Sequence, residues 1–190
     1  MLPSDMLSDE IEQIYCMLDV LEVMHKKLKA NENVNLNDLR KVINFFHNFA
    51  HKSHNKKEED VLIPELNKQS NSMDKQLFKE MVKENHLAEY YISILRELVK
   101  DVSAGDETAK LKLITMIKKY IDLEKKHVQK EQIYIIPLCK EKLSKKKYNR
   151  ILTEFKLVDE SEFGSGMHSK FHSAFSKVIN SMKKQYYTQN

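Results

Sequence analysis

The sequence predicts an all-α protein, an antiparallel up-down-up-down four-helix bundle with additional C-terminal helices. Apolar residues recur at three- and four-residue steps along several long segments, which is the period of amphipathic helices. No stretch of the sequence alternates with a period of two, so we expect no sheet. Only three glycines and three prolines interrupt the 190 residues. Four long helices joined by short polar loops pack most simply as an antiparallel bundle.

The first helix is expected to begin near Ser8, because acidic residues follow it and the start of a helix favours negative charge. His25 lies on the apolar stripe of this helix and not on its polar face. A polar loop over residues 31–35 is expected to follow. The stripe consists of Ile11, Ile14, Leu18, Leu21, His25 and Leu28.

The second helix, opened by Asn35 or Asn37, carries an imidazole and a carboxylate on its apolar stripe. These groups belong to His54 and Glu58, which lie about one turn apart. Proline cannot donate the backbone hydrogen bond of a helix interior, so Pro64 is expected to close this helix. The stripe consists of Ile43, His47, Ala50, His54, Glu58 and Val61.

The third helix follows a turn at residues 68–72, and Gly105 is expected to stop it. The fourth helix repeats the design of the second, because His127 and Glu131 lie on its apolar stripe and Pro137 follows. The third stripe consists of Phe78, Met81, Ala88, Ile92, Leu95 and Val99, and the fourth of Leu113, Ile117, Tyr120, Glu124, His127, Glu131 and Ile135.

Two regions are expected: residues 1–140 form the bundle, and residues 141–190 form a helical extension packed on it. Ser144 is a candidate cap for the first helix of the extension. A flexible stretch at residues 160–166 is expected to separate it from the last helix. This last helix is expected to pack against the bundle or against a second copy of the chain, which would give a homodimer.

Composition and charge exclude several classes of protein. No apolar run approaches the ~20 residues that a membrane span needs, and no signal peptide is evident. Cys16 and Cys139 make no disulfide framework, so a reduced, cytoplasmic setting is expected. Residues 145–147 with Arg150 form a basic cluster, but no aromatic or docking motif accompanies it. We therefore expect no nucleic-acid partner, in keeping with the modest net charge of +4.

One sequence frame occurs twice: H-x-x-K-E, four residues, then Ile-Pro, at residues 54–64 and 127–137. Side chains four residues apart lie on the same face of a helix, so each copy presents an imidazole beside a carboxylate. Burying such groups on an apolar stripe is costly unless they are paired or bind a metal. Imidazole and carboxylate ligands without thiolates suit iron, manganese or zinc, and two carboxylates can bridge two ions. The repeat therefore predicts a buried metal site.

The pattern H … H-x-x-x-E … H … H-x-x-x-E resembles the hemerythrin-like (HHE cation-binding) domain family over roughly residues 8–140. Residues 45–50 (FFHNFA) and the Ile-Pro after each motif add to the resemblance. The resemblance implies a four-helix bundle around a non-haem di-iron centre, in which an oxo or hydroxo bridge joins the ions. Carried over by motif, the ligands are Glu58 and Glu131 as bridges, His25, His54 and His127 as terminal ligands, and one residue of the third helix.

The third helix departs from the family pattern M-x-x-E-H-x-x-A. Residues 81–88 read MVKENHLA, so Asn85 takes the expected imidazole position and His86 follows one residue later, rotated by about 100° toward the polar side. Three accounts are open: a π-bulge re-aims His86, the centre is asymmetric, or another residue substitutes. His86 is retained as a candidate metal ligand, and the candidate substitutes are Glu124, His168 and His172.

A ferritin-like bundle is the alternative carboxylate-bridged arrangement, and it uses Glu-x-x-His on two helices. Glu22 with His25 and Glu124 with His127 fit that spacing. The ferritin-like scheme leaves the repeated H-x-x-x-E frame unexplained, so we favour the hemerythrin-like arrangement.

Three classes of function follow from this reading. The favoured one is a non-haem di-iron binding protein that binds or senses oxygen, nitric oxide, peroxide or iron. The second is an enzyme that consumes peroxide or nitric oxide or aids repair of iron–sulfur centres. The third is a metal-free helical interaction module. Among the tyrosines near the ligand stripes, Tyr120 is the preferred candidate for a phenol close to the bound ligand; the others are Tyr15, Tyr90, Tyr91 and Tyr134.

Overall fold

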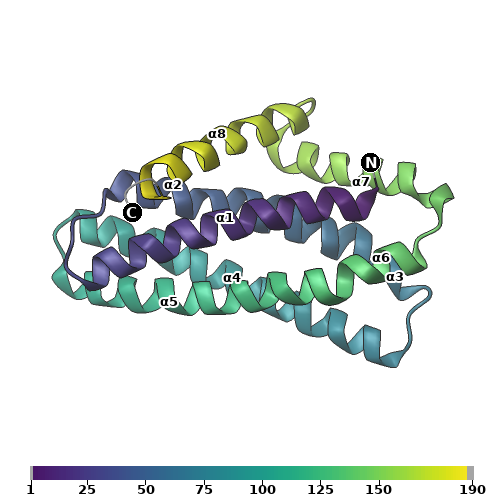
Figure 1. The fold of residues 1–190 in the computed structure, drawn as a ribbon, viewed down its shortest axis with the longest axis horizontal. Helices are drawn as coiled ribbons and strands as arrows, with labels where there is room; N and C mark the ends of the chain where they lie inside the picture. The colour runs from purple at the N-terminus through teal and green to yellow at the C-terminus, as the bar shows by residue number, and fades with distance from the viewer. Residues whose placement is uncertain (1, 188–190) are drawn as a thin grey trace.

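The computed structural model describes residues 2–187, and these residues form helices joined by short connections, with no strand among them. The four long rods of the bundle are α1, the run from α2 to α3, α4, and the run from α5 to α6 (Figure 1). α5 packs against both α1 and α4, and α2 packs against the same two helices. The elements are α1 (Pro3–Lys29), α2 (Leu36–Phe45), η1 (Phe46–Asn55), η2 (Glu58–Leu62), α3 (Ile63–Asn67), α4 (Ser72–Ser103), α5 (Glu107–Lys130), η3 (Glu131–Ile135), α6 (Ile136–Lys142), α7 (Lys145–Phe163) and α8 (His168–Tyr187).

The expected all-helical class is confirmed, and side-chain caps fix several helix starts. Asn35 accepts hydrogen bonds from the backbone at the start of α2, so of the two expected openings the structure has Asn35. Asn71 caps α4 and Asp106 caps α5 in the same way. Gly105 follows the end of α4 with a φ of +93°, a conformation that glycine adopts without steric cost.

α1 begins at Pro3 and not near Ser8. Proline suits the first helical position because its φ is already helical and its missing N–H has no partner there anyway. The earlier start adds more than one turn to the helix, so Glu10 lies well inside α1. This residue contributes to the site described below.

The expectation that Pro64 and Pro137 end their helices is wrong. The first rod continues through α3 to Asn67, and the second continues through α6 to Lys142. In each case a π-type turn precedes the proline, with Ile63 N–H donating to the Glu58 carbonyl and Ile136 N–H to that of Glu131. The wider turn contains one more residue, which accommodates the proline ring that would clash with a carbonyl in a regular α-helix.

The extension packs on the bundle of its own chain. α8 contacts α1 and α2, and α7 contacts η1 and η2 (Figure 1). The aromatic ring of Phe175 lies 5.6 Å from that of Phe45 and 5.8 Å from that of Phe49. α7 ends at Phe163, and Gly164 begins the turn to α8 with a φ of +103°. None of the helices in the described part of the chain has the length and apolarity needed to cross a membrane.

Candidate metal centre

The two copies of the repeated frame meet in the core at Glu131. His54 Nε2 lies 3.0 Å from Glu131 Oε2, and His127 Nε2 lies 2.8 Å from Glu131 Oε1. Glu58 completes the group, because ligand atoms of His54, Glu58 and Glu131 all lie within 4.8 Å of one another. All four side chains are buried. The arrangement brings two imidazoles and two carboxylates from different rods to one place.

Carboxylate oxygens around this group are buried without partners. Within residues 2–187, no hydrogen bond reaches either carboxylate oxygen of Glu58 or of Glu124. His127 Nε2 and Glu131 Oε1 approach closely but lack the angles of a hydrogen bond. An isolated buried carboxylate is strongly disfavoured in an apolar interior, whereas a cation among these oxygens would remove that cost. The oxygen and nitrogen donors fit iron, manganese or zinc.

Burial dominates the electrostatics of the two unpartnered carboxyl groups. Burial, reinforced by the nearby charge of Glu131, raises the pKa of Glu58 well above its ordinary value. Burial likewise raises the pKa of Glu124 to about 7, although the charge of His127 opposes the shift. Without a cation both groups therefore tend to hold a proton, and a bound metal would replace it.

Glu131 and its two histidines behave in the opposite way. Burial disfavours the charge of Glu131, but the imidazoles of His54 and His127 outweigh it and lower its pKa. Burial would also lower the pKa of each histidine, yet Glu131 raises both well above the ordinary value. Without a cation, the two histidines are therefore held as imidazolium groups around one ionised carboxylate, and a metal would have to displace the Nε2 proton of each ring.

Two further carboxylates hold the outer nitrogens of the histidines. His54 Nδ1 donates to Glu10 Oε2 of α1, and His127 Nδ1 donates to Glu84 Oε2 of α4, each over 3.0 Å. From the sequence, Glu10 is expected only as an acidic residue of the first turn of its helix, and Glu84 only as part of the third-helix motif. Nothing in the sequence marks Glu10 and Glu84 as partners of the histidines, because glutamates are common on helices.

The family model of the hemerythrin HHE cation binding domain matches residues 7–145, close to three quarters of the chain. The chain belongs to this family. Neither the comparison with curated proteins nor that with solved structures gives a match. This is the family that the sequence motifs resembled. Its cation-binding character agrees with the buried imidazoles and carboxylates described above.

His25 lies away from the group formed by His54, Glu58, His127 and Glu131. Its half-buried ring lies among Lys118, Lys29 and Glu22, and burial with the charge of Lys118 lowers its pKa. The rise of 1.5 Å per residue separates His25 from Glu10 by about 22 Å along α1. Since Glu10 is the α1 residue that reaches His54, the first helix of this HHE domain presents a carboxylate at that level.

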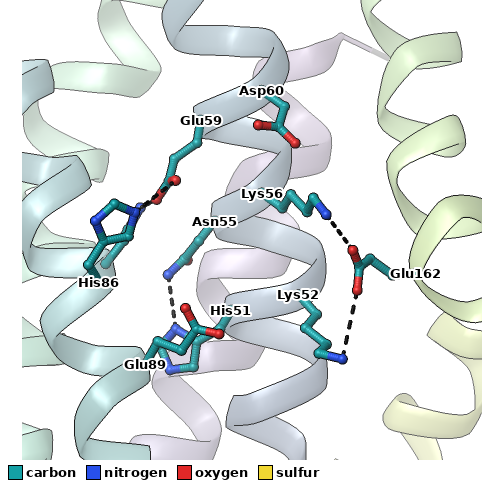
Figure 2. Close-up of a pocket in the computed structure, with 10 residues that line it drawn as sticks. His51, Lys52, Asn55, Lys56, Glu59, Asp60, His86, Glu89 and Glu162 are labelled. Carbon is teal, nitrogen blue, oxygen red and sulfur yellow. Dashed lines mark hydrogen bonds and ion pairs between the residues drawn. The ribbon is translucent and has the colours of Figure 1, made fainter.

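His86 lies on the outside of the HHE domain, in a pocket of about 340 Å³ beside the centre (Figure 2). Its side chain is 67% exposed, and its Nε2 lies 3.6 Å from Glu59 Oε2. Asn85 is buried and donates to Glu59 Oε1 over 2.9 Å. α4 is a regular α-helix from Ser72 to Ser103, so the outward direction of His86 follows the rotation expected from the sequence and not a π-bulge.

His51 lines the inner wall of the same pocket and was not among the predicted site residues. Asn55 Nδ2 donates to His51 Nδ1 over 3.1 Å, and His51 Nε2 lies 3.2 Å from the Tyr120 hydroxyl (Figure 2 draws the first of these contacts). Burial lowers the pKa of His51 to about 3 and raises that of Tyr120 well above its ordinary value. Tyr120 therefore contacts His51, which lies three residues before His54.

His168 and His172 lie in a second polar cluster on the extension. His168 Nδ1 and His172 Nε2 lie 2.6 Å and 3.0 Å from the same oxygen of Asp159. The ammonium of Lys57 lies 3.0 Å from that oxygen too. The spacing of Asp159, His168 and His172 would allow them to hold a metal ion, but Lys57 already supplies a positive charge there. Of the expected substitutes for the third-helix ligand, Glu124 is buried within electrostatic range of His127, Glu131 and His54, whereas His168 and His172 lie in this second cluster.

Proposed function

We propose that this hemerythrin HHE protein is a non-haem di-iron protein that binds or senses oxygen, nitric oxide or peroxide. The observation that carries the proposal is the meeting of two imidazole–carboxylate pairs beside buried oxygens that lack hydrogen-bond partners in the described chain. In this proposal Glu58 and Glu131 bridge two irons, and His54 and His127 are terminal ligands. Glu124 supplies the further oxygen donor.

The charges of the proposed ligands suit two divalent ions. Ionised Glu58, Glu124 and Glu131 would bring three negative charges against the four positive charges of two ferrous ions. The carboxylates at the Nδ1 side of the two histidines are neutralised separately, since Glu10 pairs with Lys57 and Glu84 with Lys130. The short connections favour an up-down-up-down order, in which each rod runs antiparallel to the next. In this order the proposed ligands come from rods that run in opposite directions.

Iron bound there would supply redox chemistry and an open coordination position for a small ligand. The buried pair of His51 and Tyr120 favours binding of a small ligand over its reduction, because reduction needs a ready proton donor. The pKa of Tyr120 is raised and that of His51 is lowered to about 3, so at neutral pH the phenol keeps its proton and the imidazole has no extra proton to give. We therefore favour a carrier or sensor over an enzyme.

Replacing Glu58 or Glu131 by Ala tests the bridging assignment. Each bridge would contribute to both ions, so iron content should fall from about two per chain to less than one after anaerobic loading with ferrous iron. Metal analysis and the visible spectrum after exposure to oxygen or nitric oxide measure the effect. Glu141→Ala, an exposed glutamate of α6, is the matched control and should keep wild-type iron content. Two irons retained in Glu131→Ala would remove the bridge, and steady turnover of peroxide by the loaded protein would favour an enzyme.

A further inference from the structure

The repeated frame contains a lysine that the metal ligands alone do not explain. Lys57 and Lys130 occupy the same place in the two copies, three residues after the ligand histidine. Lys57 Nζ donates to Glu10 Oε1 over 2.6 Å, and Lys130 Nζ donates to Glu84 Oε1. The second oxygen of each glutamate accepts from the Nδ1 of the ligand histidine in the same copy. The two halves of the centre therefore share one His–Glu–Lys arrangement.

We infer that each glutamate–lysine pair is a clamp that positions the ligand histidine. The clamps are Glu10 with Lys57 around His54, and Glu84 with Lys130 around His127. This inference rests on the proposed function, because it concerns how the imidazoles face the metal. It assigns a positioning role to two residues of the frame and to two glutamates from other helices.

The spacing of the frame explains why a lysine three residues after the histidine suits this role. Side chains three residues apart are neighbours on one face of a helix, so one carboxylate from an adjacent helix can reach both. One oxygen binds the ammonium and the other binds Nδ1–H, which fixes the plane of the carboxylate and the tautomer of the ring. Nε2 is then left to face the centre with its lone pair.

Glu10 and Glu84 are placed to support the histidines and not to bind the metal themselves. Both oxygens of each glutamate are already occupied, one by lysine and one by histidine. Glu58 and Glu124 differ, since neither finds a hydrogen-bond partner in the chain from residue 2 to residue 187. The hydrogen-bonding pattern therefore distinguishes Glu58 and Glu124, whose oxygens are available to a metal, from Glu10 and Glu84, whose oxygens are not.

The two clamps differ in burial. The Lys57 side chain is fully buried, and its Nζ also contacts Ser53 Oγ at 2.9 Å and Asp159 Oδ2 at 3.0 Å. The Lys130 side chain is 32% exposed and that of Glu84 23%. Removing Lys57 would leave buried carboxylates uncompensated and endanger folding, whereas Lys130 can be replaced at small cost. The second clamp is therefore the one to test.

The test compares Glu84→Leu, Glu84→Gln and Lys130→Met with the wild type. Zn²⁺ affinity is measured by competition with a chelator, and the Nδ1–H signal of His127 by nitrogen NMR of the Zn²⁺-loaded chain. Glu84→Leu should bind Zn²⁺ about 10- to 100-fold more weakly and lose the protected Nδ1–H signal. Glu84→Gln keeps an oxygen acceptor and should recover the signal and most of the affinity. Lys130→Met should weaken binding by a smaller factor.

Lys126→Met is the matched control, because Lys126 is an exposed lysine about one turn before Lys130. It should bind Zn²⁺ like the wild type, and thermal melts of the metal-free variants check that all of them fold. Unchanged Zn²⁺ affinity in both Glu84→Leu and Lys130→Met would overturn the clamp, as would an unchanged His127 signal. A wild-type chain that binds Zn²⁺ but no iron would contradict the proposed function and leave the clamp in place. A wild-type chain that binds neither ion would overturn both.

Discussion

At the scale of single residues, His51 shows how burial and hydrogen bonds set the state of an imidazole. Its Nδ1 accepts from Asn55, which leaves the proton on Nε2, the nitrogen that contacts Tyr120. This neutral form agrees with the lowering of its pKa to about 3 by burial. His54, only three residues later, is driven the other way, because carboxylates of Glu10 and Glu131 flank both of its nitrogens. The partners of a histidine, and not burial alone, decide its charge.

His51 should make the protein sensitive to mild acid. The unfolded ring takes up a proton near pH 6.5 and the folded ring only near pH 3, so the unfolded state binds more protons between these values. The free energy of unfolding should therefore fall by about 1.4 kcal/mol per pH unit below pH 6.5 from this group alone. His51→Gln removes the titrating ring and should flatten the slope, measured by urea unfolding at pH 6.5, 5.5 and 4.5. Exposed His86→Gln should keep the wild-type slope, and equal slopes in all three proteins would contradict the assignment.

At the scale of elements, the continuation of the helix past Pro64 has a consequence for the extension. It creates α3, and α3 carries Glu65, a buried carboxylate that accepts from Lys147 and from Arg150 of α7. These bonds, with one from Lys68, lower the pKa of Glu65 to about 2. A helix that stopped at the proline would leave α7 without this anchor.

Glu65→Gln should loosen α7 from the bundle. The variant loses the charge that two cations of α7 bind, which should cost about 1–2 kcal/mol because those cations are partly exposed. Amide hydrogen exchange in α7 should accelerate while that in α5 stays unchanged. The wild-type contribution is complete above pH 4.5 and disappears as pH falls toward 2, since the folded-state pKa is depressed. The control is Glu154→Gln, because Glu154 pairs with Arg150 at the surface. If amide exchange in α7 is the same in Glu65→Gln and Glu154→Gln, Glu65 is not the anchor.

At the scale of the whole molecule, the proposed centre ties the rods together through α1, η1, η2, α4, α5 and η3. Metal binding to the folded state alone stabilises it by mass action, by about 4 kcal/mol when the free ion is at a thousand times its dissociation constant. The protons held by His54 and His127 compete with the metal, because Glu131 raises both pKa values.

Ferrous iron should therefore raise the unfolding temperature, and more strongly at pH 8 than at pH 6. Lower pH keeps the two imidazoles protonated, so the apparent affinity for iron and the stabilisation should both decrease. Anaerobic calorimetry with and without iron measures the shift, and a chelator should reverse it. Glu131→Gln should abolish most of the shift. A stabilisation that is the same at both pH values, or the same in Glu131→Gln, would argue against iron at this centre.

Much of this architecture follows from the sequence. The three- and four-residue period of apolar residues determines the all-helical class, and the repeated frame determines the family and the inward direction of His54, Glu58, His127 and Glu131. These conclusions hold because the period of a helix fixes the angle of each side chain around its axis. The rotation of about 100° per residue likewise predicted that His86 faces outward.

Only the tertiary structure decided which residues of different helices lie at the same height. The apolar stripe of the first helix pointed to His25, but the packing of α1 along its neighbours brings Glu10 and not His25 to His54. The same axial register brings Glu84 to His127. Height depends on how the rods slide against one another, which is fixed by contacts between distant parts of the chain and leaves no periodic signal in the sequence.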